Sequence, residues 1–200
     1  MLLSLVTAVV STAVTGCGED GSGGDTSKSA LDTPFELHAV TDGQEVSGHG
    51  ISLVVPADWT ASAEEKLDAQ GRTYEWAVQA PTSGTDFPPF VNMSMGVPGQ
   101  TSTGFDAAPE ALKTLEGISP DFEVLDEGEL DVPGVDHAYQ IHYERASNYQ
   151  GQSVKVELVQ VFLDMPDDVL SSVRFQAPAG SFDDSGLEDV LNSLTVAVRS

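Results

Sequence analysis

Cys17 is the side chain in this sequence whose position most clearly indicates a chemistry. It is the only cysteine in the chain, so an intramolecular disulfide cannot form. It lies between an apolar N-terminus without charged residues, 1–16, and a run rich in Gly, Ser and Asp. A thiol at such a boundary is typical of a site of lipid attachment. The chemistry predicted for Cys17 is therefore attachment of the chain to a membrane.

Residues 1–16 predict a secretory signal peptide. Their apolar block is too short to cross a bilayer, which takes about 20 apolar residues. It fits the apolar region of a signal, which runs about 7–15 residues and ends at small residues. Val14-Thr15-Gly16-Cys17 resembles the lipobox of bacterial lipoproteins, in which the cysteine receives a diacylglycerol and becomes the first mature residue. A signal peptide normally opens with positive charge, so we expect the true translation start to lie upstream of Met1.

Two other interpretations of the leader are open. Residues 1–16 could form a buried helix or strand with Cys17 as an ordinary thiol, although the Gly-rich sequence that follows cannot continue a packed element. An ordinary signal peptidase could instead cut between Ala13 and Gly16, which would leave a secreted protein with one thiol.

The sequence divides into a leader, a tether and one domain. Residues 17–33 predict a flexible, acidic, Gly/Ser-rich tether, because a segment with few apolar side chains cannot repay the entropy of ordering. Such a tether has a root-mean-square span of about 20–25 Å. Residues 34–200 are long enough to fold as a single domain with a substantial core.

The charge of the chain excludes two classes of partner. There are 32 Asp and Glu residues against 8 Lys and Arg residues, which gives a net charge of −24. Such a surface repels phosphate groups, so we expect no nucleic-acid binding and no adhesion to anionic lipid through a basic patch. The densest acidic stretch, 121–136, contains no Lys or Arg. It could attract a basic partner or divalent cations, and its simplest interpretation is a solvated face.

The residue types that support catalysis do not form a complete motif. His137 and His142 have opposite parity on a predicted strand, so they cannot form a two-residue metal clip. Asp136 precedes His137, but the chain has no Gly-x-Ser-x-Gly nucleophile motif. Gly21-Ser22-Gly23-Gly24 follows no strand and precedes no Gly-Lys-Ser/Thr, so it does not predict a phosphate loop. We expect no enzyme activity, no metal site and no cofactor.

Aromatic side chains are the remaining candidates for a binding surface. Trp and Tyr anchor many interfaces, although packing in the core is the commoner use of these side chains. The candidate pocket or docking residues are Trp59, Tyr74, Trp76, Phe90, Tyr139 and Tyr143.

The periodicity of apolar residues predicts the elements that position these side chains. Strands are predicted at 51–55, 74–78, 91–95, 135–143, 154–163 and 169–175, with a strand or hairpin over 122–132. Helices are predicted over 105–117 and 182–194. The strand at 154–163 is apolar on both faces, so we expect it at the centre of a sheet covered on both sides. The predicted fold class is α+β, an antiparallel sheet flanked by helices.

Three segments resemble landmarks of a known family. Ile51 to Trp59, Phe87 to Met93 and Val190 to Val196 are similar to the packing motifs of the actinobacterial LpqN/LpqT-type lipoproteins. The resemblance covers most of residues 50–198 in element order. It implies the PsbP-like α/β/α sandwich, shared with PsbP of photosystem II and with nuclear Ran-binding relatives. Members are generally described as non-enzymatic lipoproteins or docking proteins, so the resemblance supplies no catalytic residue.

Two hypotheses about function follow from the sequence. The first is a non-catalytic lipoprotein outside the cell, anchored through acylated Cys17 to the outer face of the cytoplasmic membrane, which presents an acidic domain to a protein partner; a basic protein is one candidate for that partner. The second is a carrier or sensor of an apolar small molecule or lipid in the cell envelope. An envelope hydrolase is a weaker third hypothesis, because no catalytic motif is complete.

The first prediction concerns Cys17. Mass spectrometry of the mature N-terminal peptide is expected to find a diacylated Cys17 at residue one, because two acyl chains anchor a protein stably. An unmodified Cys17 within an intact chain would refute lipidation.

Overall fold

The computed structural model describes residues 34–63, 66–67, 73–82, 87–95, 105–119, 121–165 and 169–197. The predicted signal peptide, the tether and Cys17 lie outside the described residues. Their assignments therefore remain predictions from the sequence.

A large antiparallel sheet dominates the described chain. Its strand order is β4-β6-β7-β11-β10-β9-β8, and β5 also pairs with β6. In chain order the strands are β4 (Thr60–Ser62), β5 (Lys66–Leu67), β6 (Thr73–Gln79), β7 (Phe90–Met95), β8 (Glu123–Glu129), β9 (Ala138–Tyr149), β10 (Gln152–Met165) and β11 (Val169–Pro178).

A second, smaller antiparallel sheet has four strands in the order β1-β2-β3-β12. These strands are β1 (Glu36–Val40), β2 (Gly43–Gly48), β3 (Ile51–Val55) and β12 (Thr195–Val196). The last strand brings the C-terminal part of the chain back to β3, where Val196 pairs with Ile51.

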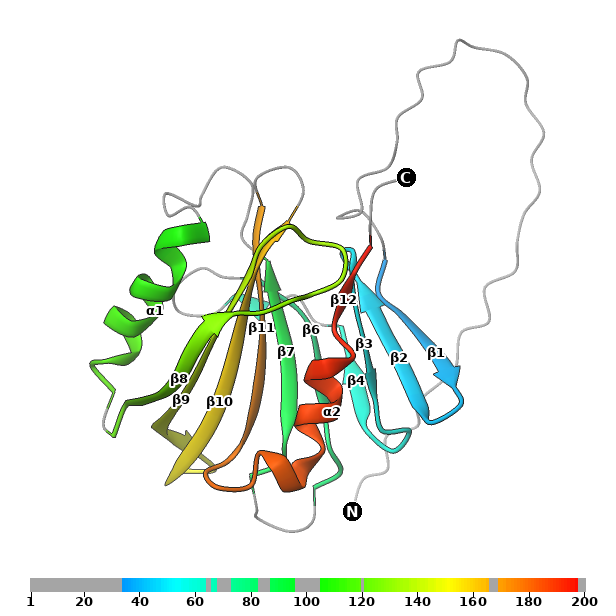
Figure 1. The fold of residues 1–200 in the computed structure, drawn as a ribbon. Helices are drawn as coiled ribbons and strands as arrows, with labels where there is room; N and C mark the ends of the chain where they lie inside the picture. Colours follow the sequence, from blue (N-terminus) through cyan, green and yellow to red (C-terminus); the bar gives the residue numbers. More distant parts are fainter. Residues whose placement is uncertain are drawn as a thin grey trace, which may run out of the picture.

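Each face of the large sheet has its own apolar cluster. On one face, side chains of β7, β10 and β11 pack against the small sheet and α2 (Leu187–Asn192). On the other face, side chains of β9 and β10 pack against α1 (Ala108–Glu116), which a 3-10 turn at Phe105–Ala107 precedes. Figure 1 shows α1 beside β8 and β9, with the small sheet at the opposite side of the molecule.

The prediction that 154–163 lies at the centre of a sheet, covered on both sides, is confirmed. β10 lies between β11 and β9. Val161 and Leu163 belong to the cluster under the small sheet, whereas Leu158 and Phe162 belong to the cluster under α1. Burial of a large apolar side chain contributes about 1.5–3 kcal/mol, and β10 contributes such side chains to both clusters.

The predicted α+β class, one antiparallel sheet flanked by helices, is wrong. The described chain is mostly β, with two antiparallel sheets. One layer that we expected to be helical is the small sheet, because residues 36–48 form two strands that the sequence did not predict. The helix predicted over 182–194 is the six-residue α2, because Gly186 before it has a left-handed φ of 78°.

The strand predicted at 51–55 is confirmed, and other local features of the chain follow from its turn and helix residues. β3 matches 51–55, and Trp59 returns to the core after a turn in which its N–H donates to the Pro56 carbonyl at 3.1 Å. Pro109 lies in the first turn of α1. The turn that joins β9 to β10 has positive φ at Gln150 and Gly151, which is the backbone that a type I′ turn requires. No described helix has the length and apolar character needed to cross a membrane.

A partly buried ion pair attaches α1 to the large sheet. Glu116 lies in the last turn of α1, and its carboxylate is 3.3 Å from Nε of Arg145 on β9. The same carboxylate is 3.9 Å from Nη2 of Arg174 on β11. Arg174 also donates two hydrogen bonds, 3.1 and 3.0 Å long, to the side-chain oxygen of Gln160. This network satisfies the side chain of Gln160, which is buried among apolar neighbours on β10.

The second prediction follows from this network. Glu116→Gln is expected to lower the free energy of unfolding by about 2–3 kcal/mol, because it leaves two largely buried guanidinium groups without their carboxylate. Urea denaturation measures the change. Glu110→Gln is the matched control on the same helix, where the side chain is 75% exposed and the expected loss is at most about 1 kcal/mol. Equal losses in the two variants would contradict the anchoring role.

Candidate functional site

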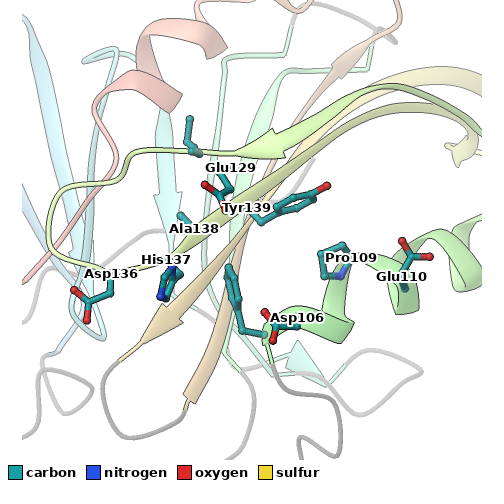
Figure 2. A pocket seen from close by; sticks show the side chains of 10 residues that line it. Asp106, Pro109, Glu110, Glu129, Asp136, His137, Ala138 and Tyr139 are labelled. Atoms are coloured by element: carbon teal, nitrogen blue, oxygen red, sulfur yellow. The ribbon is translucent and has the colours of Figure 1, made fainter.

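An acidic cleft lies between the start of α1 and the adjacent ends of β8 and β9. Its volume is about 320 Å³. Figure 2 shows lining side chains from the start of α1 on one side and from the end of β8 and the segment that leads into β9 on the other. The lining residues are Phe105, Asp106, Pro109, Glu110, Glu129, Leu130, Asp136, His137, Ala138 and Tyr139.

The helix side of the cleft follows from how α1 begins. Pro109 fits the first turn, where a backbone N–H is not needed. Asp106 and Glu110 lie in the first turns of the 3-10 segment and of α1, where negative charge is favoured by the helix dipole. Phe105 turns its ring toward His137, with the ring centroids 6.2 Å apart.

The sheet side of the cleft comes from the loop between β8 and β9. Glu129 ends β8, and its register partner on β9 is Tyr139. The Leu130 N–H donates to the Ala138 carbonyl at 3.0 Å, so the two strands stay paired up to the cleft. Asp136 and His137 are exposed at the start of β9.

Most of the negative charge in the cleft is uncompensated. Glu110 pairs with Lys113 at 2.5 Å. Asp106, Glu129 and Asp136 make no ion pair within the part of the chain that the structure describes. The lining contains no Lys or Arg. An arrangement of carboxylates beside aromatic rings can bind a cation by charge-assisted hydrogen bonds and by cation–π contact.

Tyr139 is the polar aromatic side chain in the cleft. Its partial burial raises the pKa of the phenol above the ordinary value of 10.0, and the nearby negative charge of Glu127 raises the pKa further. Lys113 bridges α1 to β8, with Nζ 3.0 Å from a Glu127 carboxylate oxygen. Its hydrogen bonds to Glu110 and Glu127 raise the pKa of the ammonium group. Because its pKa is raised, the Tyr139 phenol is neutral at ordinary pH and can donate a hydrogen bond.

The structure separates the six aromatic residues that the sequence suggested. Trp59 and Trp76 are buried between the two sheets, and Tyr143 is buried under α1. Phe90 is half-buried beside a second cavity, of about 470 Å³, lined by Thr60, Ser62, Ala77, Val78, Gln79 and Phe90. Of the five whose side chains the structure describes, Tyr139 lines the acidic cleft and the others do not. The side chain of Tyr74 lies outside the described residues.

His137, directly before β9, and His142, on β9, have different surroundings. His137 lines the acidic cleft. His142 lies 2.8 Å from a carboxylate oxygen of Glu157 and packs against the ring of Phe182. Among the described residues, no group of three or more His, Cys, Asp or Glu side chains is arranged to hold a metal ion.

Sequence reasoning did not identify most of the cleft. Phe105 was assigned to the apolar stripe of a helix, and the carboxylates of 121–136 to a solvated face. The available signal was the charge pattern: this stretch has seven acidic residues (Asp121, Glu123, Asp126, Glu127, Glu129, Asp131 and Asp136) and no basic residue.

The fold is similar to that of a solved envelope protein. LpqN of Mycobacterium tuberculosis, described as involved in cell envelope biogenesis, matches with a TM-score of 0.51 and 18% sequence identity, over 82% of this chain and 91% of LpqN. This similarity confirms an LpqN-like fold and, at that identity, shows the fold alone. No protein-family model matches the sequence, and no curated protein matches it.

Two further solved structures are similar at a lower level. PA94 from Pseudomonas aeruginosa, of unknown function, matches with a TM-score of 0.46 and 15% identity over 83% of this chain and 98% of PA94. The Ran-binding protein Mog1p from Saccharomyces cerevisiae matches with a TM-score of 0.47 and 11% identity over 84% of this chain and 97% of Mog1p. We draw no inference from these two, because their TM-scores lie below 0.5.

The third prediction concerns the proton on Tyr139. An NMR titration of ¹³C-labelled tyrosine is expected to give a pKa above 10.0 for Tyr139. Glu127→Gln should bring the pKa nearer to that value by removing a negative charge, whereas Glu123→Gln, elsewhere on β8, should not. Because the folded state holds this proton more tightly, the resulting stability is complete below about pH 10 and is lost as the pH rises through the folded-state pKa. A Tyr139 pKa at or below 10.0 would contradict the prediction.

Proposed function

We propose that this chain is a non-catalytic protein of the cell envelope, anchored through acylated Cys17, that binds a basic segment of a partner protein in the acidic cleft. The observation that carries the proposal is the cleft itself, which Asp106, Glu129 and Asp136 line beside aromatic rings, with no Lys or Arg among its described lining residues. The envelope location is supported by the LpqN-like fold, since LpqN is described as involved in cell envelope biogenesis.

The charge of the whole chain favours the same class of partner. At a net charge of −24, the surrounding potential draws a cationic segment toward the domain and speeds its encounter. Every Lys or Arg side chain that the structure describes already has a carboxylate partner: Lys113, Arg145, Lys155 and Arg174. The described surface therefore offers negative charge with few competing internal cations.

The contents of the cleft indicate how specificity arises. A cavity of about 320 Å³ is at the small end of ligand sites, which run about 300–1,000 Å³. It suits the insertion of one basic side chain better than the enclosure of a large molecule. The Phe105 and Tyr139 rings supply flat apolar surfaces for the side-chain stem or the planar guanidinium group. Arg is favoured over Lys, because it can stack on a ring while it donates to carboxylates.

The carrier hypothesis gains no support from the cleft. An apolar ligand requires a mostly apolar cavity, and carboxylates line much of this one. Trp59, Trp76 and Tyr143, which could have lined an apolar cavity, are at most 7% exposed and are packed in the two core clusters.

The fourth prediction tests the cleft with a tetra-arginine amide peptide. The double variant Asp106→Asn with Glu129→Gln is expected to weaken binding about tenfold, because it removes two carboxylates that contact the guanidinium groups. The matched control, Asp184→Asn with Glu188→Gln, removes the same charge from exposed residues near α2 and should weaken binding by less than about twofold at physiological salt, where distant charges are screened. Isothermal titration calorimetry at about 150 mM salt measures both. An equal loss in the two variants would show nonspecific attraction and would contradict the proposal.

A further inference from the structure

Within the part of the chain that the structure describes, the outer edge of the small sheet is open to another strand. β1 pairs with β2 and, among the described residues, with no other strand. All five residues of β1 are exposed. Its backbone N–H and C=O groups that point away from β2 are therefore available to pair with an extended segment.

The other edges of the two sheets are less suited to pairing. β8, at one edge of the large sheet, has a bulge between Val124 and Asp126 and carries four carboxylates. Bulges and charges are the devices by which proteins block edge pairing. β4 and β12 have only three and two residues. β1 instead keeps an unbroken register with β2 from Glu36 to Val40, and it contains no Pro or Lys.

The two faces of β1 differ in character. Leu37 lies opposite the fully buried Val46 and is itself 46% exposed, so the apolar face of the small sheet continues to the edge. Glu36 and His38 lie on the opposite face, where His38 is the register partner of Glu45. A strand added beside β1 would meet Leu37 and Ala39 on one face and Glu36, His38 and Val40 on the other, where Glu36 and His38 lie 3.0 Å apart.

We propose that β1 accepts an extended segment of a partner protein in which apolar and basic residues alternate. The apolar residues would lie beside Leu37 and Ala39, and the basic residues would lie on the face that carries Glu36, because successive side chains of a strand point to opposite faces. Backbone hydrogen bonds would supply affinity, and the alternate side chains would supply specificity.

The charge around β1 identifies this partner and disfavours a second copy of the same chain. Residues 34–63 contain four carboxylates and no Lys or Arg. Pairing β1 with β1 of another copy would bring together two molecules that each carry a charge of −24. The edge is also separate from the acidic cleft, since β1 and α1 lie at opposite sides of the molecule (Figure 1). The inference therefore does not rest on the function proposed for the cleft.

The test uses the six-residue peptide Val-Lys-Val-Lys-Val-Lys, capped at both ends, and two matched variants. Leu37→Lys and Leu125→Lys each replace a similarly exposed leucine, 46% and 44% exposed, on opposite edge strands. Leu37→Lys is expected to weaken peptide binding about fivefold or more, because it removes the apolar contact and places a charged side chain beside the peptide's valines. Leu125→Lys changes the net charge equally and should leave the affinity within about twofold.

A modified peptide separates strand pairing from simple attraction between charges. N-methylation of every second residue keeps each side chain but removes backbone donors, so this peptide should bind far more weakly than the unmodified one. In the unaltered protein, the unmodified peptide should also slow hydrogen exchange of β1 amides. Equal binding of the two peptides, equal effects of the two substitutions, or unchanged exchange in β1 would each overturn the inference.

Discussion

Two-sided burial of β10 determines the arrangement of the layers. A strand that is apolar on both faces cannot lie at a surface, so the large sheet needs a cover on each side. The small sheet and α2 cover one face, and α1 covers the other. The second cover is short, and an ion pair from its last turn to Arg145 and Arg174 fixes it in place. The start of α1 is thereby held beside β8 and β9, and the acidic cleft forms between them.

The scarcity of basic residues links the stability of the domain to its surface. Eight Lys and Arg residues are present against 32 Asp and Glu residues. Arg145 and Arg174 are used beneath α1, and Lys113 ties α1 to β8. Little positive charge is left to neutralise the described surface. Negative charge over a wide area would attract a cationic partner, so charge alone would not make binding specific. In the two proposals, the cleft would supply specificity through its shape, and the edge of β1 would supply it through backbone pairing.

Much of the large sheet could be predicted from the sequence, because its central strands alternate strongly. Residues 154–163 are apolar on both faces, and this pattern correctly predicted that they form an inner strand covered on both sides. The small sheet could not be predicted in full: Glu36 to Gly48 contains few large apolar residues, and β2 gains its strand conformation from packing Val46 against a distant part of the chain. The α+β assignment failed for that reason. The cleft was missed because it joins Asp106 to Asp136, which only the tertiary fold brings together.

The central claim is that the cleft receives a basic segment of a protein, and photo-crosslinking in intact cells tests it most directly. A benzoylphenylalanine residue in place of His137 would report on the cleft, and the same residue in place of the exposed Ser153 would be the control. Mass spectrometry of both proteins and extracted lipids would then identify what was bound. We predict that position 137, and not position 153, captures one protein through a peptide that contains Arg or Lys at the crosslink. Recovery of a single stoichiometric lipid and no protein from position 137 would contradict the claim.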